Sequence, residues 1–226
     1  MKIAVLGTGS VGRTLASRLA EIGHEVAIGT RDVMATMRTS DSDQFGNPPY
    51  ASWADDHPAV HLATFADAVD FSELVVNATS GTVSRSVLDS VGAERLGDTI
   101  LVDVSNPLDF SRGFPPTLSV CNTESLAEQL QAAFPKVRVV KTLNTVTAAL
   151  MAHPEHLVGG AHTVFVSGND ADAKHQVTEL LASLGHHDVI DLGDITTARG
   201  VEMYLPLWLR LMSALGTSEF NVKVVR

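Results

Sequence analysis

Three glycines near the N-terminus follow the spacing GxGxxG, which suits a phosphate-containing ligand. Gly7, Gly9 and Gly12 follow the apolar run of residues 3–6 and precede apolar residues at helical spacing. In such a strand-turn-helix unit the first glycine permits the tight turn, the second admits a pyrophosphate and the third allows close helix packing. We predict dinucleotide contacts from Gly7, Thr8, Gly9, Ser10, Val11 and Gly12. The alternative is a structural turn that binds nothing.

The end of the second strand indicates which dinucleotide is preferred. Sites for NAD place an acidic residue there, whereas sites for NADP place small hydroxyl and arginine residues around the 2′-phosphate. Here Thr30 and Arg31 could both contact that phosphate. Asp32 is a counter-signal, but it can instead cap the next helix. We therefore predict NADP(H), with an ordinary surface charge as the alternative for Arg31.

Strand and helix patterns alternate along most of the chain. We predict strands at residues 3–6, 25–29, 60–63, 74–78, 99–104, 137–143, 163–167 and 188–192. Helices are predicted at residues 11–22, 65–69, 83–96, 126–134, 146–151, 171–184 and 195–215, the last kinked at Pro206. Residues 39–58 are polar, contain prolines and predict a loop with little regular structure.

This alternation predicts an α/β protein with a Rossmann-type, doubly wound sheet. We expect the sheet to be mostly parallel, with helices on both faces and a small C-terminal α/β extension. The expected division is a dinucleotide-binding domain at 1–144 and an extension at 145–226 that completes the acceptor pocket.

Composition excludes some classes of protein and favours one compartment. The 226 residues include 26 acidic and 16 basic side chains, a net charge of −10 that argues against nucleic-acid binding. A single cysteine, Cys121, favours a reducing cytoplasm. The apolar runs at residues 1–6 and 204–215 are too short for a membrane span, so we expect no membrane contact.

Four stretches of the sequence resemble the NADPH-dependent coenzyme F420 reductases. The chain is also similar to the N-terminal domains of the STEAP metalloreductases. The resemblance is carried by residues 6–12 with Thr30 and Arg31, by residues 77–79, by residues 140–146, and by residues 198–202 leading to 205–207.

The resemblance implies hydride transfer between NADP(H) and a deazaflavin, coenzyme F420, with the two rings stacked in one pocket. It requires no acid or base pair, and we predict no catalytic side chain and no metal. Residues beyond the fourth and fifth strands should flank the nicotinamide, namely Ala78, Thr79, Ser105, Asn106 and Pro107. The wall against the second ring is expected from Leu143, Asn144, Thr145, Val146 and Leu207.

The identity of the acceptor stays open at this point. The archaeal enzymes differ over residues 38–57, a region that could help cover the second ring. The anionic tail of F420 needs a basic patch, for which Lys141, Arg112 and Arg199 are candidates. Each could equally be a surface charge, and Arg199 could pair with Glu202.

Alternative functions are an FMN or FAD reductase and an NADP(H)-sensing binding protein without turnover. The first domain of a prephenate or 3-hydroxyacid dehydrogenase is a further alternative. It fits poorly, because two more strand patterns follow residue 144 where those enzymes usually add a long helical domain.

Three further features bear on site chemistry or assembly. His153, Glu155 and His156 could be read as metal ligands, although Pro154 suggests a helix start and the spacing gives no further ligand. Cys121 has no recognisable partner and is expected to be an inert buried thiol. The last helix carries too many apolar residues for one stripe, so we expect it to be covered all round, and a homodimer interface there is a hypothesis.

Overall fold

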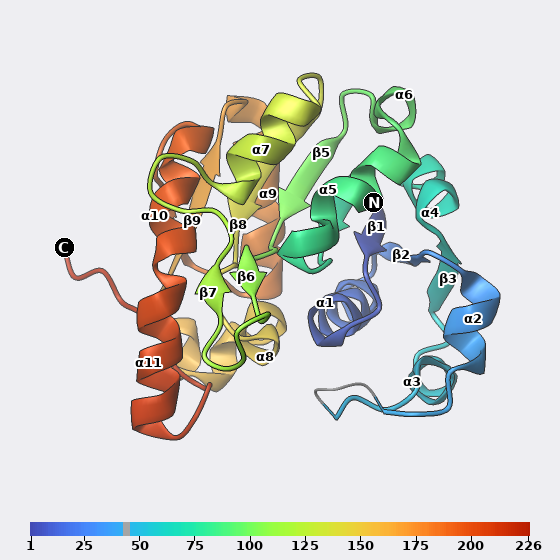
Figure 1. The fold of residues 1–226 in the computed structure, drawn as a ribbon, viewed down its shortest axis with the longest axis horizontal. Helices are drawn as coiled ribbons and strands as arrows, with labels where there is room; N and C mark the ends of the chain where they lie inside the picture. Colours follow the sequence, from blue (N-terminus) through green and yellow to red (C-terminus); the bar gives the residue numbers. More distant parts are fainter. Residues whose placement is uncertain (43–45) are drawn as a thin grey trace.

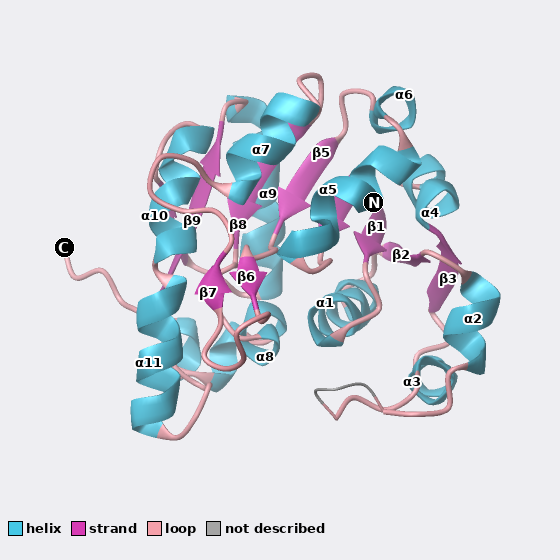
Figure 2. Ribbon diagram, viewed as in Figure 1, coloured by secondary structure: helices cyan, strands magenta, loops and turns pink. Residues whose placement is uncertain are grey.

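The computed structural model describes residues 1–42 and 46–226. Within these residues the main sheet has eight strands in the order β10-β9-β8-β5-β4-β1-β2-β3. They are β1 (Lys2–Leu6), β2 (Glu25–Thr30), β3 (Val60–Thr64), β4 (Leu74–Asn77), β5 (Ile100–Asp103), β8 (Arg138–Thr142), β9 (Thr163–Gly168) and β10 (Asp188–Asp191). Figure 2 shows this sheet in magenta with helices on both sides.

The predicted doubly wound, mostly parallel sheet is confirmed. Strands β3, β2, β1, β4, β5 and β8 run parallel, while β9 pairs antiparallel with β8 and parallel with β10. Because β9 hydrogen-bonds directly to β8, the sheet continues across residue 144. The division of the chain at that residue stays a prediction.

The helices cover the sheet from both sides (Figure 1). They are α1 (Ser10–Glu21), α2 (Val33–Arg38), α3 (Tyr50–Asp56), α4 (Phe65–Phe71), α5 (Gly81–Val91), α6 (Ala93–Leu96), α7 (Leu126–Ala133), α8 (Ala148–Ala152), α9 (Ala171–Leu184), α10 (Ala198–Met203) and α11 (Leu205–Leu215). Short 3₁₀ turns lie at η1 (Pro154–His156), η2 (Val158–Gly160) and η3 (Ile195–Thr197).

Both faces of the sheet are buried, which explains the uninterrupted apolar runs of the strands. In β1, Ile3 and Val5 pack in one hydrophobic cluster with α1, α8 and α9, whereas Ala4 and Leu6 pack in the opposite cluster with α4, α5 and α7. Each fully buried leucine or isoleucine contributes about 2 kcal/mol to the free energy of unfolding. The two layers of helices therefore hold the strand ends in fixed positions.

Several predicted elements differ from those in the structure. The predicted loop at 39–58 contains α3, and residues 43–45 of that prediction lie outside the described residues. The predicted helix 83–96 is instead α5 and α6, because Gly92 adopts φ +93° between them. The sequence analysis also missed the antiparallel hairpin of β6 (Leu108–Asp109) and β7 (Thr117–Leu118).

The predicted C-terminal helix is divided rather than continuous. The structure has η3, α10 and then α11, with the break at Tyr204 and Pro206 in the first turn of α11. Proline has no amide N–H and cannot donate to the preceding turn. The sequence analysis expected this helix to be covered all round. In the single chain that expectation is wrong, since Leu207 and Leu215 are 56% and 58% exposed.

Candidate functional site

The glycine turn between β1 and α1 has the geometry that its sequence predicts. Gly7 adopts φ +118°, and a Cβ atom there would lie 2.8 Å from the carbonyl oxygen of Ala78. A Cβ at Gly12 would lie 2.0 Å from the carbonyl oxygen of Gly7. Around Gly9, no described atom lies within 4 Å of the corresponding position. The turn is therefore packed on both sides and open in the middle, where a ligand could approach the backbone.

The N-terminus of α1 faces this opening. In the part of the chain that the structure describes, no side chain caps the helix, because its N-cap residue is Gly9. The first amides of an α-helix have no acceptor within the helix and carry part of its positive dipole. This end of α1 can therefore bind an anionic group such as a pyrophosphate.

The end of β2 places a cation, Arg31, beside the glycine turn. Arg31 is exposed and, over residues 1–42 and 46–226, forms neither a hydrogen bond nor an ion pair. Asp32 caps α2, because its Oδ1 atom accepts a hydrogen bond of 2.9 Å from the amide of Ala35. The counter-signal for NAD thus has a structural explanation, and Arg31 is available for a phosphate.

The Thr30 hydroxyl forms a hydrogen bond within the protein. It lies 2.8 Å from Thr36 Oγ1, and that hydroxyl donates its own hydrogen to the carbonyl oxygen of Asp32. Thr30 must therefore donate to Thr36. The predicted phosphate contact of Thr30 stays a prediction, and Thr36 joins the residues near this site.

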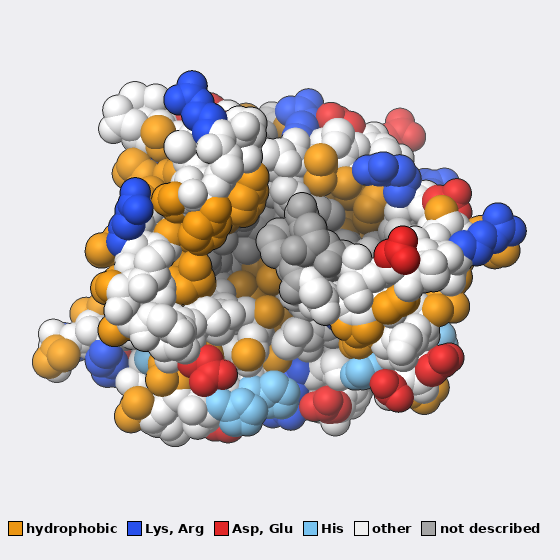
Figure 3. Space-filling model, turned by 60° about the horizontal axis from the view of Figure 1, so that its bottom comes forward, with side chains coloured by type: hydrophobic (Ala, Val, Ile, Leu, Met, Phe, Trp, Pro, Cys, Tyr) orange, Lys and Arg blue, Asp and Glu red, His pale blue; other side chains and the backbone are white. Residues whose placement is uncertain are grey.

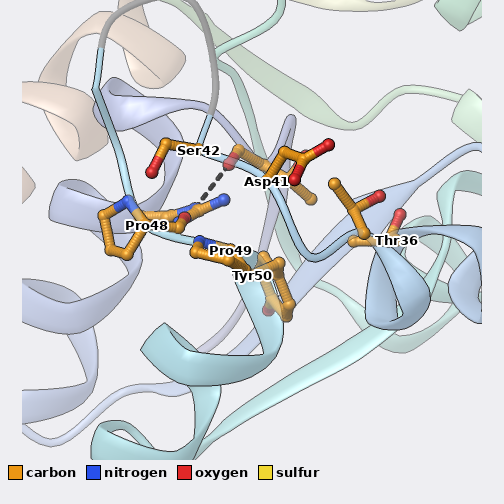
Figure 4. Close-up of a pocket in the computed structure, with 9 residues that line it drawn as sticks. Thr36, Asp41, Ser42, Pro48, Pro49 and Tyr50 are labelled. Atoms are coloured by element: carbon orange, nitrogen blue, oxygen red, sulfur yellow. Dashed lines mark hydrogen bonds between the residues drawn. The ribbon is translucent and has the colours of Figure 1, made fainter.

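A pocket of about 270 Å³ lies next to the glycine turn. Its walls come from the turn, from α1, from α2 and from the segment leading into α3. It is lined by Thr8, Arg13, Thr36, Thr39, Asp41, Ser42, Pro48, Pro49 and Tyr50. Figure 4 shows that the side chains of this segment lie around the pocket beside α2. Residues 39–42 and 48–50 thus approach the glycine turn at this pocket.

Arg13, which the sequence analysis missed, joins this segment to the glycine turn. Its Nε atom donates to the carbonyl oxygen of Thr8 at 2.6 Å, and its Nη1 atom donates to that of Pro48 at 2.6 Å. The guanidinium also lies 5.2 Å from the ring centre of Tyr50. Ser10 adds a 2.7 Å hydrogen bond to Asn47. These contacts hold residues 47–50 against the turn.

Polar side chains connect the carboxyl ends of β4 and β5. Asn77 is fully buried, and its Nδ2 atom donates to Asp103 Oδ1 at 2.9 Å and to Ser84 Oγ at 3.1 Å. Thr79 donates its hydroxyl to Asn77 Oδ1 at 2.7 Å. Ser105 donates both its amide and its hydroxyl to Asp103 Oδ1, at 3.2 and 2.6 Å. Thr79 and Ser105, two of the residues predicted to flank the nicotinamide, therefore belong to one hydrogen-bonded network.

Lys141 is the centre of a buried charge cluster, and it is not a surface group. The Nζ atom lies 2.8 Å from Asp103 Oδ2, 3.0 Å from Glu202 Oε1 and 2.5 Å from the carbonyl oxygen of Ser105. Burial alone lowers the pKa of Lys141, but the carboxylates of Asp103 and Glu202 outweigh it and raise the pKa above its usual value. Both sequence interpretations of Lys141, as a basic patch for a ligand tail or as a surface charge, were wrong.

Arg199 does not pair with Glu202 as the sequence suggested. Its guanidinium forms a bidentate ion pair with Glu128, with distances of 2.8 and 2.5 Å. The hydrogen bond from Arg199 lowers the pKa of Glu128, and Ser125 also donates to this carboxylate. Arg199 therefore joins α10 to α7 at the surface.

Four of the five residues predicted to form the acceptor wall are buried directly beyond the end of β8. Leu143 adopts φ +56°, and its side chain is 4% exposed. Asn106 Nδ2 donates to the carbonyl oxygen of Asn144, and Asn144 Nδ2 donates to Asn106 Oδ1 and to the carbonyl oxygen of Val201. Thr145 and Val146 are also buried, whereas Leu207 is exposed on α11. The structure therefore brings the nicotinamide-side and wall residues together through Asn106 and Asn144.

The face of the molecule that contains the carboxyl ends of the strands is hollowed. Figure 3 shows hydrophobic side chains gathered around this hollow. The exposed hydrophobic residues of the chain include Phe110 and Phe114 of the β6–β7 hairpin, Met203 of α10 and Leu207 of α11.

The structure also bears on three other features of the sequence. His153, Glu155 and His156 come together at partly exposed positions, with potential ligand atoms within 4.8 Å of one another. The absence of a metal stays a prediction. Cys121 is exposed, so the expectation of a buried thiol was wrong. Each helix of residues 1–42 and 46–226 falls short of the length and hydrophobicity that a membrane span needs.

The parallel sheet, the glycine turn and the open N-terminus of α1 define a dinucleotide-binding protein of the Rossmann class. Comparison with known proteins identifies the family. The profile of the family described as "NADP oxidoreductase coenzyme F420-dependent" matches residues 2–107. The crystal structure of a protein from Arthrobacter sp. FB24, assigned provisionally as an F420-dependent NADP reductase, is 60% identical over the whole length of both chains, with a TM-score of 0.95.

The curated relatives of the chain include F420-dependent NADP reductases and STEAP metalloreductases. The F420-dependent NADP reductase of Methanothermobacter marburgensis is 28% identical over 93% of this chain and 92% of its own length. Metalloreductase STEAP3 of Rattus norvegicus is 32% identical over 92% of this chain, but the chain spans only 38% of that protein. The chain belongs to the family of coenzyme F420-dependent NADP oxidoreductases, and the recognition made from its sequence is confirmed.

Proposed function

We propose that the protein transfers a hydride between NADP(H) and the deazaflavin coenzyme F420. The observation that carries this proposal is the open glycine turn beside Arg31, which has no partner among residues 1–42 and 46–226, a combination that suits a dinucleotide with a 2′-phosphate. Family membership supports the choice of acceptor.

The strand order indicates how the dinucleotide lies. In a doubly wound sheet the ligand crosses the carboxyl edge at the point where the strand order reverses, here between β1 and β4. The adenosine half then lies over β1 and β2, near Arg31 and the pocket beside Thr36. The nicotinamide half lies over β4 and β5, near Thr79, Ser105 and Asn106.

The chain's own residues bind and orient the reactants. When bound, NADPH supplies a hydride from the nicotinamide to the acceptor, which takes up one proton from solvent. The network of Asn77, Asp103 and Ser105 fixes the loops on the nicotinamide side, and Asn144 fixes the wall on the acceptor side. Positioning of the two rings supplies the catalysis, so no side chain has to act as acid or base.

We also propose a cytoplasmic homodimer. The exposed Leu207 and Leu215 of α11 form an apolar face that a second copy of the chain would cover. Light scattering of the purified protein should give twice the chain mass of 24.0 kDa. A monomeric mass would contradict the dimer and leave the proposed reaction untouched.

The reaction is tested by anaerobic mixing of the protein with NADPH and F420, following the loss of deazaflavin absorbance. Parallel mixtures contain FMN in place of F420 and NADH in place of NADPH. We expect turnover of F420 with a strong preference for NADPH. Turnover of FMN alone would reassign the acceptor, and tight NADPH binding without any turnover would indicate a nucleotide-sensing protein.

A further inference from the structure

The charge cluster of Lys141, Asp103 and Glu202 is difficult to explain by stability alone. All three side chains are at most 1% exposed. Removing a charge from water costs several kcal/mol, and well-packed apolar residues often replace a buried ion pair without loss of stability. The position of these charges therefore suggests a use other than holding the fold together.

The cluster lies at the nicotinamide half of the proposed site. Asp103 is the last residue of β5 and is aligned with Lys141 of β8, while Glu202 comes from α10. Lys141 and Asp103 together hold the carbonyl, amide and hydroxyl groups of Ser105. Ser105 begins the loop that is proposed to flank the nicotinamide, so the cluster fixes this loop from beneath.

The charges in the cluster do not balance. Among the described residues it holds one ammonium group and two carboxylates, and the three N–H groups of Lys141 are used by Asp103, Glu202 and Ser105. Glu202 also accepts hydrogen bonds from the amides of Leu126 and Ala127 at 2.7 and 3.1 Å. These amides begin α7, whose dipole compensates only part of the second negative charge. An excess of negative charge is left in the interior.

We propose that Asp103 and Glu202 are positioning residues whose excess negative charge favours the oxidised, cationic nicotinamide over the reduced, neutral form. This inference rests on the proposed function. Loss of a hydride to the deazaflavin leaves one positive charge on the nicotinamide ring. Fixed negative charge in a poorly solvated interior stabilises that product and the transition state leading to it.

The test compares the binding of NADP⁺ and NADPH by calorimetry in the full-length protein. Glu202→Gln removes one negative charge at nearly constant volume. We expect the ratio of the Kd for NADP⁺ to the Kd for NADPH to rise about tenfold, which is equivalent to a rise of about 30 mV in the potential of the bound couple. A merely structural role would weaken both ligands alike and leave the ratio unchanged.

Three further variants separate the effect of charge from other effects of the substitution on the ratio of the two Kd values. Glu202→Asp retains the charge and should restore the wild-type ratio, while Asp103→Asn removes the other carboxylate and should shift the ratio in the same direction as Glu202→Gln. Glu128→Gln is the matched control, because it also removes a carboxylate at the start of α7 but outside the cluster. It should leave the ratio unchanged.

Failure of this inference can be distinguished from failure of the proposed function. An unchanged ratio in the folded Glu202→Gln or Asp103→Asn protein, confirmed by its unfolding transition, would overturn the inference while NADPH turnover persists. If the wild-type protein binds NADPH no better than NADH and transfers no hydride, the proposed function itself is wrong.

Discussion

The two ends of the candidate site differ in how they are built. Over β1 and β2 the groups that would bind phosphates are open as far as the described residues go, namely the backbone around Gly9, the N-terminus of α1 and Arg31. Over β5 and β8 the polar groups are buried and bonded to one another around Lys141. The open end can bind a highly charged ligand with little rearrangement. The closed end is suited to fixing loops against which a nicotinamide ring can be aligned.

Substitution at Gly9 should have the largest effect and should separate binding from folding. Gly9 has φ −77° and open space around it, so Gly9→Val should change the stability by less than about 1 kcal/mol. The affinity for NADPH should fall at least about a thousandfold, or roughly 4 kcal/mol, because the side chain occupies the pyrophosphate position. Calorimetry and thermal unfolding measure the two effects. Normal affinity would show that the dinucleotide does not cross this turn.

Substitution of Lys141, at the closed end of the site, should lower the stability of the whole fold. Lys141→Met leaves Asp103 and Glu202 buried without their cation, which should lower the free energy of unfolding by about 3–5 kcal/mol. Urea unfolding provides the measurement. The exposed Lys136 is the control, and its substitution by methionine should change stability by less than about 0.5 kcal/mol. Equal effects of the two substitutions would contradict the described cluster.

Outside both ends of the site, a buried histidine between α9 and β10 should make the fold acid-sensitive. Burial lowers the pKa of His186 to about 4, and its Nε2 atom lies 2.9 Å from the carbonyl oxygen of Met151. The unfolded chain binds this proton near pH 6.5, so stability falls as the pH drops from about 6.5 to about 4, by roughly 3 kcal/mol in total.

A glutamine at this position tests the pH effect. His186→Gln cannot titrate and should flatten the decline in stability between pH 6.5 and 4, as followed by urea unfolding at several pH values. His175→Gln, at a side chain that is 73% exposed, should leave the decline unchanged. The same slope in wild type and His186→Gln would assign the acid sensitivity to other groups.

Substitution of Arg31 should have the smallest free-energy effect and should be specific to one nucleotide. Arg31→Ala removes a charge-assisted contact of about 2 kcal/mol, so NADPH should bind roughly thirtyfold more weakly while NADH is little affected. Arg85→Ala is the control, because Arg85 pairs with Asp89 on the surface of α5. An equal loss for NADPH and NADH would show that Arg31 does not recognise the 2′-phosphate.

The open end could be predicted from the sequence, and the closed end could not. Gly7, Gly9, Gly12, Arg31 and Asp32 act through local geometry, and their spacing along the chain is sufficient to place them. The contacts of Lys141 join three distant segments, and Glu202 pairs with it across 61 positions rather than with its neighbour Arg199. A lysine within the apolar strand of residues 137–143 was itself the signal, because a buried ammonium group requires a partner.

The structure of residues 47–56 could not be predicted from local sequence patterns either. Residues 47–50 are held by Arg13, whose partners Thr8 and Pro48 are backbone carbonyl groups with no sequence signature. Helix α3 was missed because its apolar residues Tyr50 and Trp53 follow a run of prolines and polar residues. Tertiary contacts decide the structure of such a segment more than local propensity does.

The most direct test of the account is a single-turnover reaction between the protein, F420 and NADPH deuterated at C4, with each face of the nicotinamide labelled in a separate experiment. We expect deuterium from one of the two labelled forms to appear at C5 of the reduced deazaflavin, without exchange with solvent. Reduction of F420 with hydrogen derived only from solvent, or no reduction at all, would contradict direct hydride transfer at this site.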